Sequence, residues 1–196
     1  MDQNEPPVHT IKQYVQTSFG SNHDFRLNVH EISQLFLSEK PQLQGSNVRL
    51  LFHGTKLSAI LSILENGFYL PETEDGMFGK GVYFTDVSTK AARYTLSKDS
   101  PVGDSGYLLL CEVDLGNMKA TYVAEKWELP KEYDSRACIG QYQPDMKGFK
   151  QLGNAKFPDC TQLIMQNPKL DLNYNEYVVY DTNRIRPKYL LKITKS

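Results

Sequence analysis

The sequence predicts an antiparallel-rich α+β domain, and three observations support this prediction. Many short segments have strand composition and are bounded by turn residues. The helical patterns are few and short. The chain has 196 residues, which fits one ordinary domain. Many strands with few helices are typical of α+β domains.

The chain is expected to begin with a flexible polar leader over residues 1–10, and residues 11–196 are expected to form the folded domain. Apolar residues then recur at the spacing of a short amphipathic helix: Ile11, Tyr14, Val15 and Phe19. Alternation around Leu27 and Val29 predicts a strand.

A second set of elements follows a turn-like gap. Residues 48–53 (VRLLFH) form a predicted strand, and residues 57–65 form a helix with one apolar face. Gly67 is expected to close this helix in a left-handed conformation. Residues 71–81 (PETEDGMFGKG) form a Gly-rich loop.

The remaining elements are unevenly marked. A short strand is predicted at 82–84, and Asp86 is expected to cap a helix from Val87 to about Leu96. Strand signals are strong at the following ranges: 106–115, 174–180 and 189–193. Residues 117–170 show only weak periodicity, and a long stretch of this kind is usually functional or flexible.

Composition excludes several classes of protein. The formal net charge is −1 and no run of Lys or Arg occurs, so direct nucleic-acid binding is not expected. Cys111, Cys138 and Cys160 are odd in number and lack CxxC spacing, which argues against a zinc site and favours an intracellular protein, nuclear or cytoplasmic. The N-terminus does not resemble a secretory signal, and no apolar run is long enough to cross a membrane.

The first candidate for chemistry is LFHGT, where His53 ends a predicted strand. A neutral imidazole at cell pH can exchange a hydrogen bond with a ribose hydroxyl. Gly54 lets a ligand approach the bare backbone, whose N–H and C=O can bind a flat amide. Read alone, a His beside a Gly is more often structural.

The second candidate is MFGKGVYFTD. Gly79 and Gly81 permit tight turns, and Tyr83 offers a flat face for stacking. The segment matches neither the phosphate-binding P-loop nor the dinucleotide-binding glycine pattern, so a Gly-rich hairpin with a core Tyr is the alternative. Downstream, Lys90 and Tyr94 are four residues apart and share a face of the predicted helix.

The third candidate is LNYNEYVVYD, in which Glu176 lies within a strand of apolar and aromatic residues. A carboxylate in such surroundings is unfavourable unless it is paired, faces a cleft or is functional. Strand alternation puts Glu176 on the face opposite Asn175 and Tyr177. An edge-strand surface Glu is the alternative interpretation.

Together these segments resemble the catalytic domain of the poly(ADP-ribose) polymerases, within the diphtheria-toxin-like ADP-ribosyltransferases. That family carries a His, a Tyr and a Glu on three strands in this order, matched here by His53, Tyr83 and Glu176. Further matches are LPK at 129–131, the spacing from Ser135 through Gly140 to Pro144 and Asp145, EVDLGNM at 112–118, and KYLLKI at 188–193. The resemblance spans Tyr14 to Lys192 and is strongest to the DNA-repair-type polymerases, because the Glu is retained.

The resemblance implies two packed antiparallel sheets with short helices around an NAD-binding cleft. Gly54 is expected to bond the nicotinamide carboxamide through its backbone, and Tyr83 and Tyr94 are expected to sandwich the nicotinamide ring. His53 and Thr55 are expected to bond the adenosine-side ribose. The remaining ligand-binding positions carried over from the family are Gly67, Phe84 and Ala91.

The resemblance also implies the catalytic roles. Glu176 is expected to bond the 2′-hydroxyl of the nicotinamide ribose, to stabilise the positive charge that develops on the sugar, and to orient the nucleophile, with Lys90 near it. Met77 and Tyr174 match positions near the acceptor pocket used in chain elongation. NAD+ is the expected substrate and proteins, including this one, the expected acceptors. No metal is expected, since nicotinamide leaves readily from its cationic form.

Two features depart from the family pattern. Ala91 stands where close relatives carry a Ser that bonds the nicotinamide amide, and a missing hydrogen bond of this kind costs about 0.5–1.5 kcal/mol. The loop at 71–76 is shorter than in those relatives and lacks their stacking Tyr, so the adenine end is expected to be more open.

Activity without DNA is expected if this chain is the whole protein, because the family's helical regulatory domain and zinc fingers are not in this sequence. Two alternatives to protein ADP-ribosylation stay open. One is an NAD+ glycohydrolase, in which water replaces the acceptor. The other is a catalytically silent NAD+ or ADP-ribose binding module, which the Ala91 change and the short loop motivate.

Overall fold

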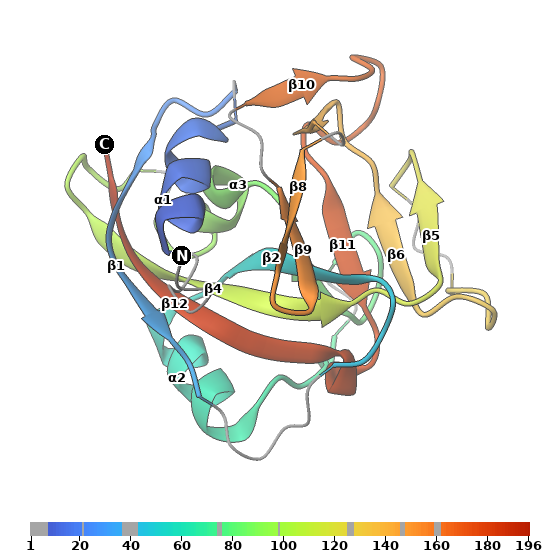
Figure 1. Cartoon of the computed structure of the whole chain (residues 1–196). Helices are drawn as coiled ribbons and strands as arrows, with labels where there is room; N and C mark the ends of the chain where they lie inside the picture. The colour runs from blue at the N-terminus through green and yellow to red at the C-terminus, as the bar shows by residue number, and fades with distance from the viewer. Residues whose placement is uncertain are drawn as a thin grey trace.

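Two large sheets form the framework of the domain in the computed structural model (Figure 1). The structure describes residues 8–20, 22–36, 43–73, 76–97, 99–124, 128–145, 148–158 and 162–196. The first seven residues of the predicted leader, Cys160, and residues 74–75 of the Gly-rich loop lie outside these ranges.

The larger sheet has six strands and holds most of the core. Its order is β1 (Leu27–Gln34), β12 (Ile185–Lys195), β4 (Ser105–Asp114), β2 (Val48–Gly54), β9 (Ala155–Pro158) and β8 (Phe149–Leu152). The central strand β4 is buried on both faces, which explains why its sequence is an almost unbroken apolar run.

The smaller sheet carries the wall on which Glu176 lies. Its order is β3 (Val82–Phe84), β11 (Glu176–Val179), β6 (Ser135–Cys138) and β5 (Met118–Thr121). A separate pair joins β7 (Tyr142–Pro144) to β10 (Leu163–Met165). The α+β prediction is therefore confirmed, although two strand pairs are parallel.

The parallel pairs are β2 with β9 and β5 with β6. Parallel neighbours need a long connection between them, and the chain supplies one in each case. The β5–β6 connection and six of the short strands fall in residues 117–170, where periodicity was weak, whereas the β2–β9 connection already begins after Gly54. Strands of three or four residues are too short to show alternation.

Two helices cover opposite faces of the larger sheet (Figure 1). Helix α1 (Val8–Thr17) packs through Ile11, Tyr14 and Val15 onto one face. Helix α2 (Leu57–Asn66) packs through Ile60 and Ile63 onto the other, where the smaller sheet also closes the core. Helix α1 begins at Val8, so its first turn lies inside the stretch predicted to be a loose leader.

Three local predictions need correction. Helix α3 spans only Ser88–Ala92, so it ends before Leu96. Asp86 does not cap it: Val87 is the cap residue, without a side-chain bond, and Asp86 is buried instead. Gly67 has the expected positive φ of 83°, but its ψ of −179° is extended rather than left-handed helical. A short 3₁₀ turn, η1 (Thr182–Arg184), precedes β12.

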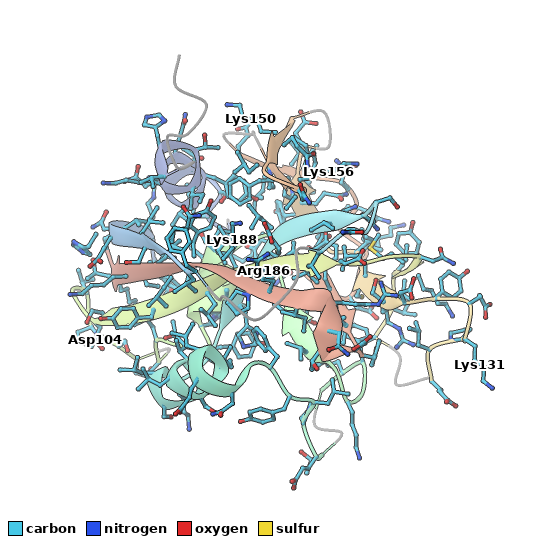
Figure 2. All side chains as sticks on the ribbon, turned by 60° about the horizontal axis from the view of Figure 1, so that its bottom comes forward. Asp104, Lys131, Lys150, Lys156, Arg186 and Lys188 are labelled. Atoms are coloured by element: carbon cyan, nitrogen blue, oxygen red, sulfur yellow. The ribbon has the colours of Figure 1, made fainter. Side chains whose placement is uncertain are left out.

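Charged side chains are spread around the surface in Figure 2. Asp104 and Lys131 lie toward opposite sides of the view, and Lys150 and Lys156 project from β8 and β9. Lys188 on β12 lies 3.3 Å from Oε1 of the buried Glu112 and so compensates that carboxylate. Within the described ranges, no helix combines the length and the apolar character needed to span a membrane.

Candidate active site

A cavity of about 550 Å³ lies where β2, β3, α3 and β11 meet. It brings together residues that the sequence separates by more than a hundred positions. The predicted site residues among its lining are His53, Gly54, Thr55, Met77, Tyr83, Phe84, Lys90, Ala91, Tyr94 and Glu176. Gly67 and Tyr174 do not line it. The prediction that three separate segments form one site is consistent with this geometry.

His53 lies near the end of β2 with its ring fixed on both sides. Its Nδ1 lies 2.8 Å from the backbone oxygen of Tyr83, and since a carbonyl only accepts, Nδ1 carries the hydrogen. Nε2 is then an acceptor. Burial lowers the pKa of His53 below 6.5, and the bond to the Tyr83 carbonyl only partly opposes this. His53 is therefore neutral at cell pH, as a ribose-binding acceptor requires.

Gly54 presses its backbone against helix α3. A Cβ at this position would lie 1.8 Å from the carbonyl oxygen of Ala91, so no other residue fits without moving the helix. The buried methyl group of Ala91 stands beside this bare backbone. The two residues together form what we call the inner wall of the cavity. Gly54 offers its peptide groups there, and Ala91 offers no side-chain hydrogen-bond donor.

The Gly-rich loop holds the hydroxyl of Tyr83. The Phe78 N–H donates to this hydroxyl at 2.9 Å, and the hydroxyl donates to the carbonyl of Gly79 at 2.9 Å. A Cβ on Gly76 would lie 2.1 Å from the same oxygen. Burial raises the pKa of Tyr83 to about 12. The loop glycines thus serve to fix a tyrosine ring, with one face left toward the cavity.

Glu176 is the first residue of β11 and is only 7% exposed. Its Oε1 lies 3.2 Å from Nζ of Lys90. The same Nζ donates to the carbonyls of Tyr174 at 3.0 Å and Asn175 at 3.3 Å. Lys90 is thereby fixed by backbone on one side and presents its charge to the carboxylate on the other, as the family resemblance implies.

Tyr94 and Met77 form the outer rim of the cavity. Tyr94 is 62% exposed and lies beyond the end of α3, where its N–H donates to the Ala91 carbonyl at 3.0 Å. Met77 is also exposed. Lys90 and Tyr94 both reach the cavity, although the helix predicted to present them on one face is too short to include Tyr94.

Tyr174 lies behind the cavity. Its side chain is 2% exposed, its hydroxyl accepts from the Asn22 N–H at 3.1 Å, and its ring contacts His23 and Tyr142. Tyr174 therefore reaches the site through its carbonyl, which holds Lys90, and not through its ring. Its expected place near the acceptor pocket stays a prediction.

Sequence reasoning missed a buried polar cluster behind Glu176, which we call the Asp86 cluster: Asp86, Asn175 and Tyr177. An Asp just before a helical pattern is the usual signature of a cap, and that signal concealed its burial. Strand alternation places Asn175 and Tyr177 on the face away from Glu176, and a buried Asn near a buried Tyr requires a polar partner such as Asp86.

The comparisons with known proteins identify the family of this chain. The family described as Poly(ADP-ribose) polymerase catalytic domain matches residues 7–195. Poly [ADP-ribose] polymerase 1 of Danio rerio is 33% identical over 98% of this chain and 20% of its own length. Poly [ADP-ribose] polymerase 2 of Homo sapiens is 32% identical over 98% of this chain and 35% of its own.

Poly [ADP-ribose] polymerase 1 of Xenopus laevis is 34% identical over 93% of this chain and 19% of its own length. The chain thus spans about a fifth of the polymerase 1 relatives. Curled sheets with few helices around the cavity define the ADP-ribosyltransferase fold. Within that class, the chain belongs to the poly(ADP-ribose) polymerase catalytic domain family.

Proposed function

We propose that this domain is an NAD+ ADP-ribosyltransferase that cleaves the nicotinamide–ribose bond of NAD+ and passes the ADP-ribose unit to proteins, including itself, and to growing chains. The observation that carries the proposal is the Lys90–Glu176 pair at the wall of the cavity, 3.2 Å apart and almost fully buried. A carboxylate held in this way can act on one ribose and not on bulk solvent.

The nicotinamide end of NAD+ is assigned to the inner wall. The Gly54 backbone offers an N–H and a C=O to the carboxamide, and the fixed ring of Tyr83 offers a stacking face. Tyr94 covers the ring from the rim. The methyl of Ala91 leaves one amide bond unmade, so binding here is expected to be weaker than with a Ser.

Adenosine is assigned to the other end of the cavity. Nε2 of His53 accepts a hydrogen bond from a hydroxyl of the adenosine ribose, and Thr55 adds a second polar contact. Gly67 and Phe84 shape the strand and helix ends around these contacts. Because the His53 ring is neutral, its Nε2 is free to accept this bond.

The reaction breaks the C1–N bond, and nicotinamide leaves with both bonding electrons as a neutral molecule. Positive charge builds on the ribose, as in glycoside cleavage. Glu176 accepts a hydrogen bond from the ribose 2′-hydroxyl and so stabilises this charge as it develops. The acceptor oxygen then bonds to C1 of the ribose. Its proton passes to the Glu176 carboxylate, which acts as the general base.

The test is incubation of the purified chain with NAD+ labelled in the adenylate part. We expect label on the protein itself, and a ladder if chains grow. Glu176→Gln should bind NAD+ with similar affinity, measured by calorimetry, but form no polymer. Equal polymer formation by this variant would refute the role of Glu176, and no label on any tested acceptor would refute the transferase activity.

A second candidate is NAD+ hydrolysis, and one observation favours it. The ring of Tyr174, which the family resemblance assigns to the acceptor side, is 2% exposed and lies against Asn22 and His23, so it is not available to contact an acceptor. Nicotinamide release without protein labelling would identify this activity.

An intracellular location, nuclear or cytoplasmic, is proposed on the buried free thiols of Cys111 and Cys138.

A further inference from the structure

A buried carboxylate behind the site has no part in the mechanism above. Asp86 is 5% exposed and does not line the cavity. Its Oδ2 accepts from Nδ2 of Asn175 at 2.8 Å and from the hydroxyl of Tyr177 at 2.9 Å. A buried carboxylate is retained only where its bonds offset its desolvation, so its position calls for an explanation.

The two partners of Asp86 bracket Glu176 in the sequence. The antiparallel register of β3 and β11 pairs Phe84 with Tyr177, and its continuation brings Asp86 opposite Asn175. Strand alternation then directs Asn175 and Tyr177 to one face and Glu176 to the other. Asp86 thus bonds to β11 on the face away from the cavity. It holds the two residues that flank Glu176, whose own carboxylate faces the cavity.

Asn175 passes this constraint to Lys90. Its side-chain Oδ1 accepts from the Gly140 N–H at 2.9 Å, and its carbonyl accepts from the Thr85 hydroxyl at 2.8 Å and from Nζ of Lys90 at 3.3 Å. Every polar side-chain atom of Asn175 is therefore bonded. Rotation of this residue would displace the oxygen that holds Lys90, and with it the partner of Glu176.

The geometry points to Asp86 as a positioning residue: through Asn175 and Tyr177 it fixes the backbone on both sides of Glu176 and, through the Asn175 carbonyl, the place of Lys90. The inference rests on the proposed function, because it concerns how the same carboxylate is aimed. Arg49 supports the cluster, since its guanidinium donates to the Tyr177 hydroxyl at 3.2 Å. Burial raises the pKa of Asp86.

The first experiment compares Asp86→Ala with Asp86→Asn. The alanine removes both bonds to the strand, and misplacement of a catalytic group by about an ångström lowers rates on the order of 100-fold. We expect kcat for nicotinamide release to fall about 10- to 100-fold while KM for NAD+ changes less than about threefold. Asp86→Asn keeps an oxygen at the Oδ2 position and should restore most of kcat.

The matched control is Glu112→Ala. Glu112 is another buried carboxylate, but it pairs with Lys188 on the larger sheet and does not line the cavity. We expect this variant to lose thermal stability with kcat of the folded fraction unchanged. A similar loss of stability with unchanged kcat in Asp86→Ala would make Asp86 merely structural and overturn the inference.

A double-mutant cycle gives the sharper result. If Asp86 acts through Glu176, then Asp86→Ala should lower kcat for nicotinamide release much less in a Glu176→Gln background than in the wild type. Equal loss in both backgrounds would overturn the inference. Should Asp86→Ala fail to fold, Tyr177→Phe removes one of the two bonds and must lower kcat without raising KM, or the inference fails.

Failure of the proposed function would be distinguishable. In that case the wild-type chain itself would release no nicotinamide. An active wild type with an equally active, folded Asp86→Ala variant would instead reject only the role of Asp86.

Discussion

The inner wall and the outer rim of the cavity each present a tyrosine, but they hold it differently. Tyr83 has its hydroxyl bonded as donor and acceptor within the Gly-rich loop, whereas Tyr94 is 62% exposed beyond the end of α3. Both were predicted to stack on the same ring. If the cavity binds NAD+ as proposed, we expect the Tyr83 face to be fixed before binding and the Tyr94 face to adjust around the ligand.

The largest effect is expected from Gly54→Ala on the inner wall. The new Cβ would lie 1.8 Å from the Ala91 carbonyl oxygen, so β2 and α3 must separate. We expect NAD+ binding by calorimetry to be lost and the melting temperature to fall. Gly106→Ala is the matched control: like Gly54, Gly106 has no positive φ, but its new Cβ would meet only side-chain ends of Thr95 and Leu96, at 3.0 Å or more. If Gly54→Ala kept its NAD+ affinity, β2 and α3 would be able to separate without loss of binding. The inner wall would then be no more rigid than the outer rim.

Next in size is the difference between Tyr83→Ala and Tyr94→Ala. Stacking of an aromatic ring contributes about 0.5–1.5 kcal/mol beyond area burial. Tyr83→Ala also releases the loop that its hydroxyl holds, so it should raise the dissociation constant for NAD+ more than Tyr94→Ala does. Equal effects of the two variants would contradict the view that the walls differ.

A smaller effect should come from Ala91→Ser, which adds a hydroxyl to the inner wall. One further hydrogen bond contributes about 0.5–1.5 kcal/mol, or roughly a 2- to 13-fold gain in affinity for nicotinamide-type inhibitors. Competition binding with benzamide would measure it. Ala91→Cys, similar in shape to serine but with only a weak S–H donor, should give little gain; an equal gain there would assign the effect to packing.

The smallest effect is expected from pH, through the buried ring of His53. Burial lowers the pKa of His53 below 6.5, so the unfolded chain takes up this proton first. The contribution of His53 to stability should therefore be flat from pH 8 to 6.5 and fall as the pH drops further, whereas NAD+ affinity should fall only at the lower pH where the folded protein protonates this ring. Comparison with His53→Gln isolates the contribution of this ring. A fall in affinity that begins above pH 6.5 would contradict a lowered pKa.

How far the sequence alone predicts the molecule differs between its parts. Helix α2 and strands β3 and β4 were predicted within a residue or two, because their apolar patterns are long or sharply bounded. His53, Tyr83 and Glu176 do line one cavity, and their motif order indicated this. Their individual roles stay predictions.

The features that could not be predicted depend on which way a side chain points and on partners that are far away in the sequence. A motif assigned Tyr174 to the acceptor side, but residues far along the chain, Asn22, His23 and Tyr142, determine where its ring lies. Asp86 reads as a helix cap because its bonds go to residues about ninety positions away. The length of α3 was overestimated because a helical spacing continues in the sequence where the backbone turns.

The place of β12 has a consequence for how the domain is made. This strand follows all the others in the chain, yet it lies between β1 and β4 in the larger sheet (Figure 1). On the ribosome, β1 and β4 must wait without their shared neighbour until β12 has been synthesised. The cavity on β2 and β11 thus depends on a late, long-range pairing step, which is intrinsically slow and leaves strand edges open to wrong partners until it is complete.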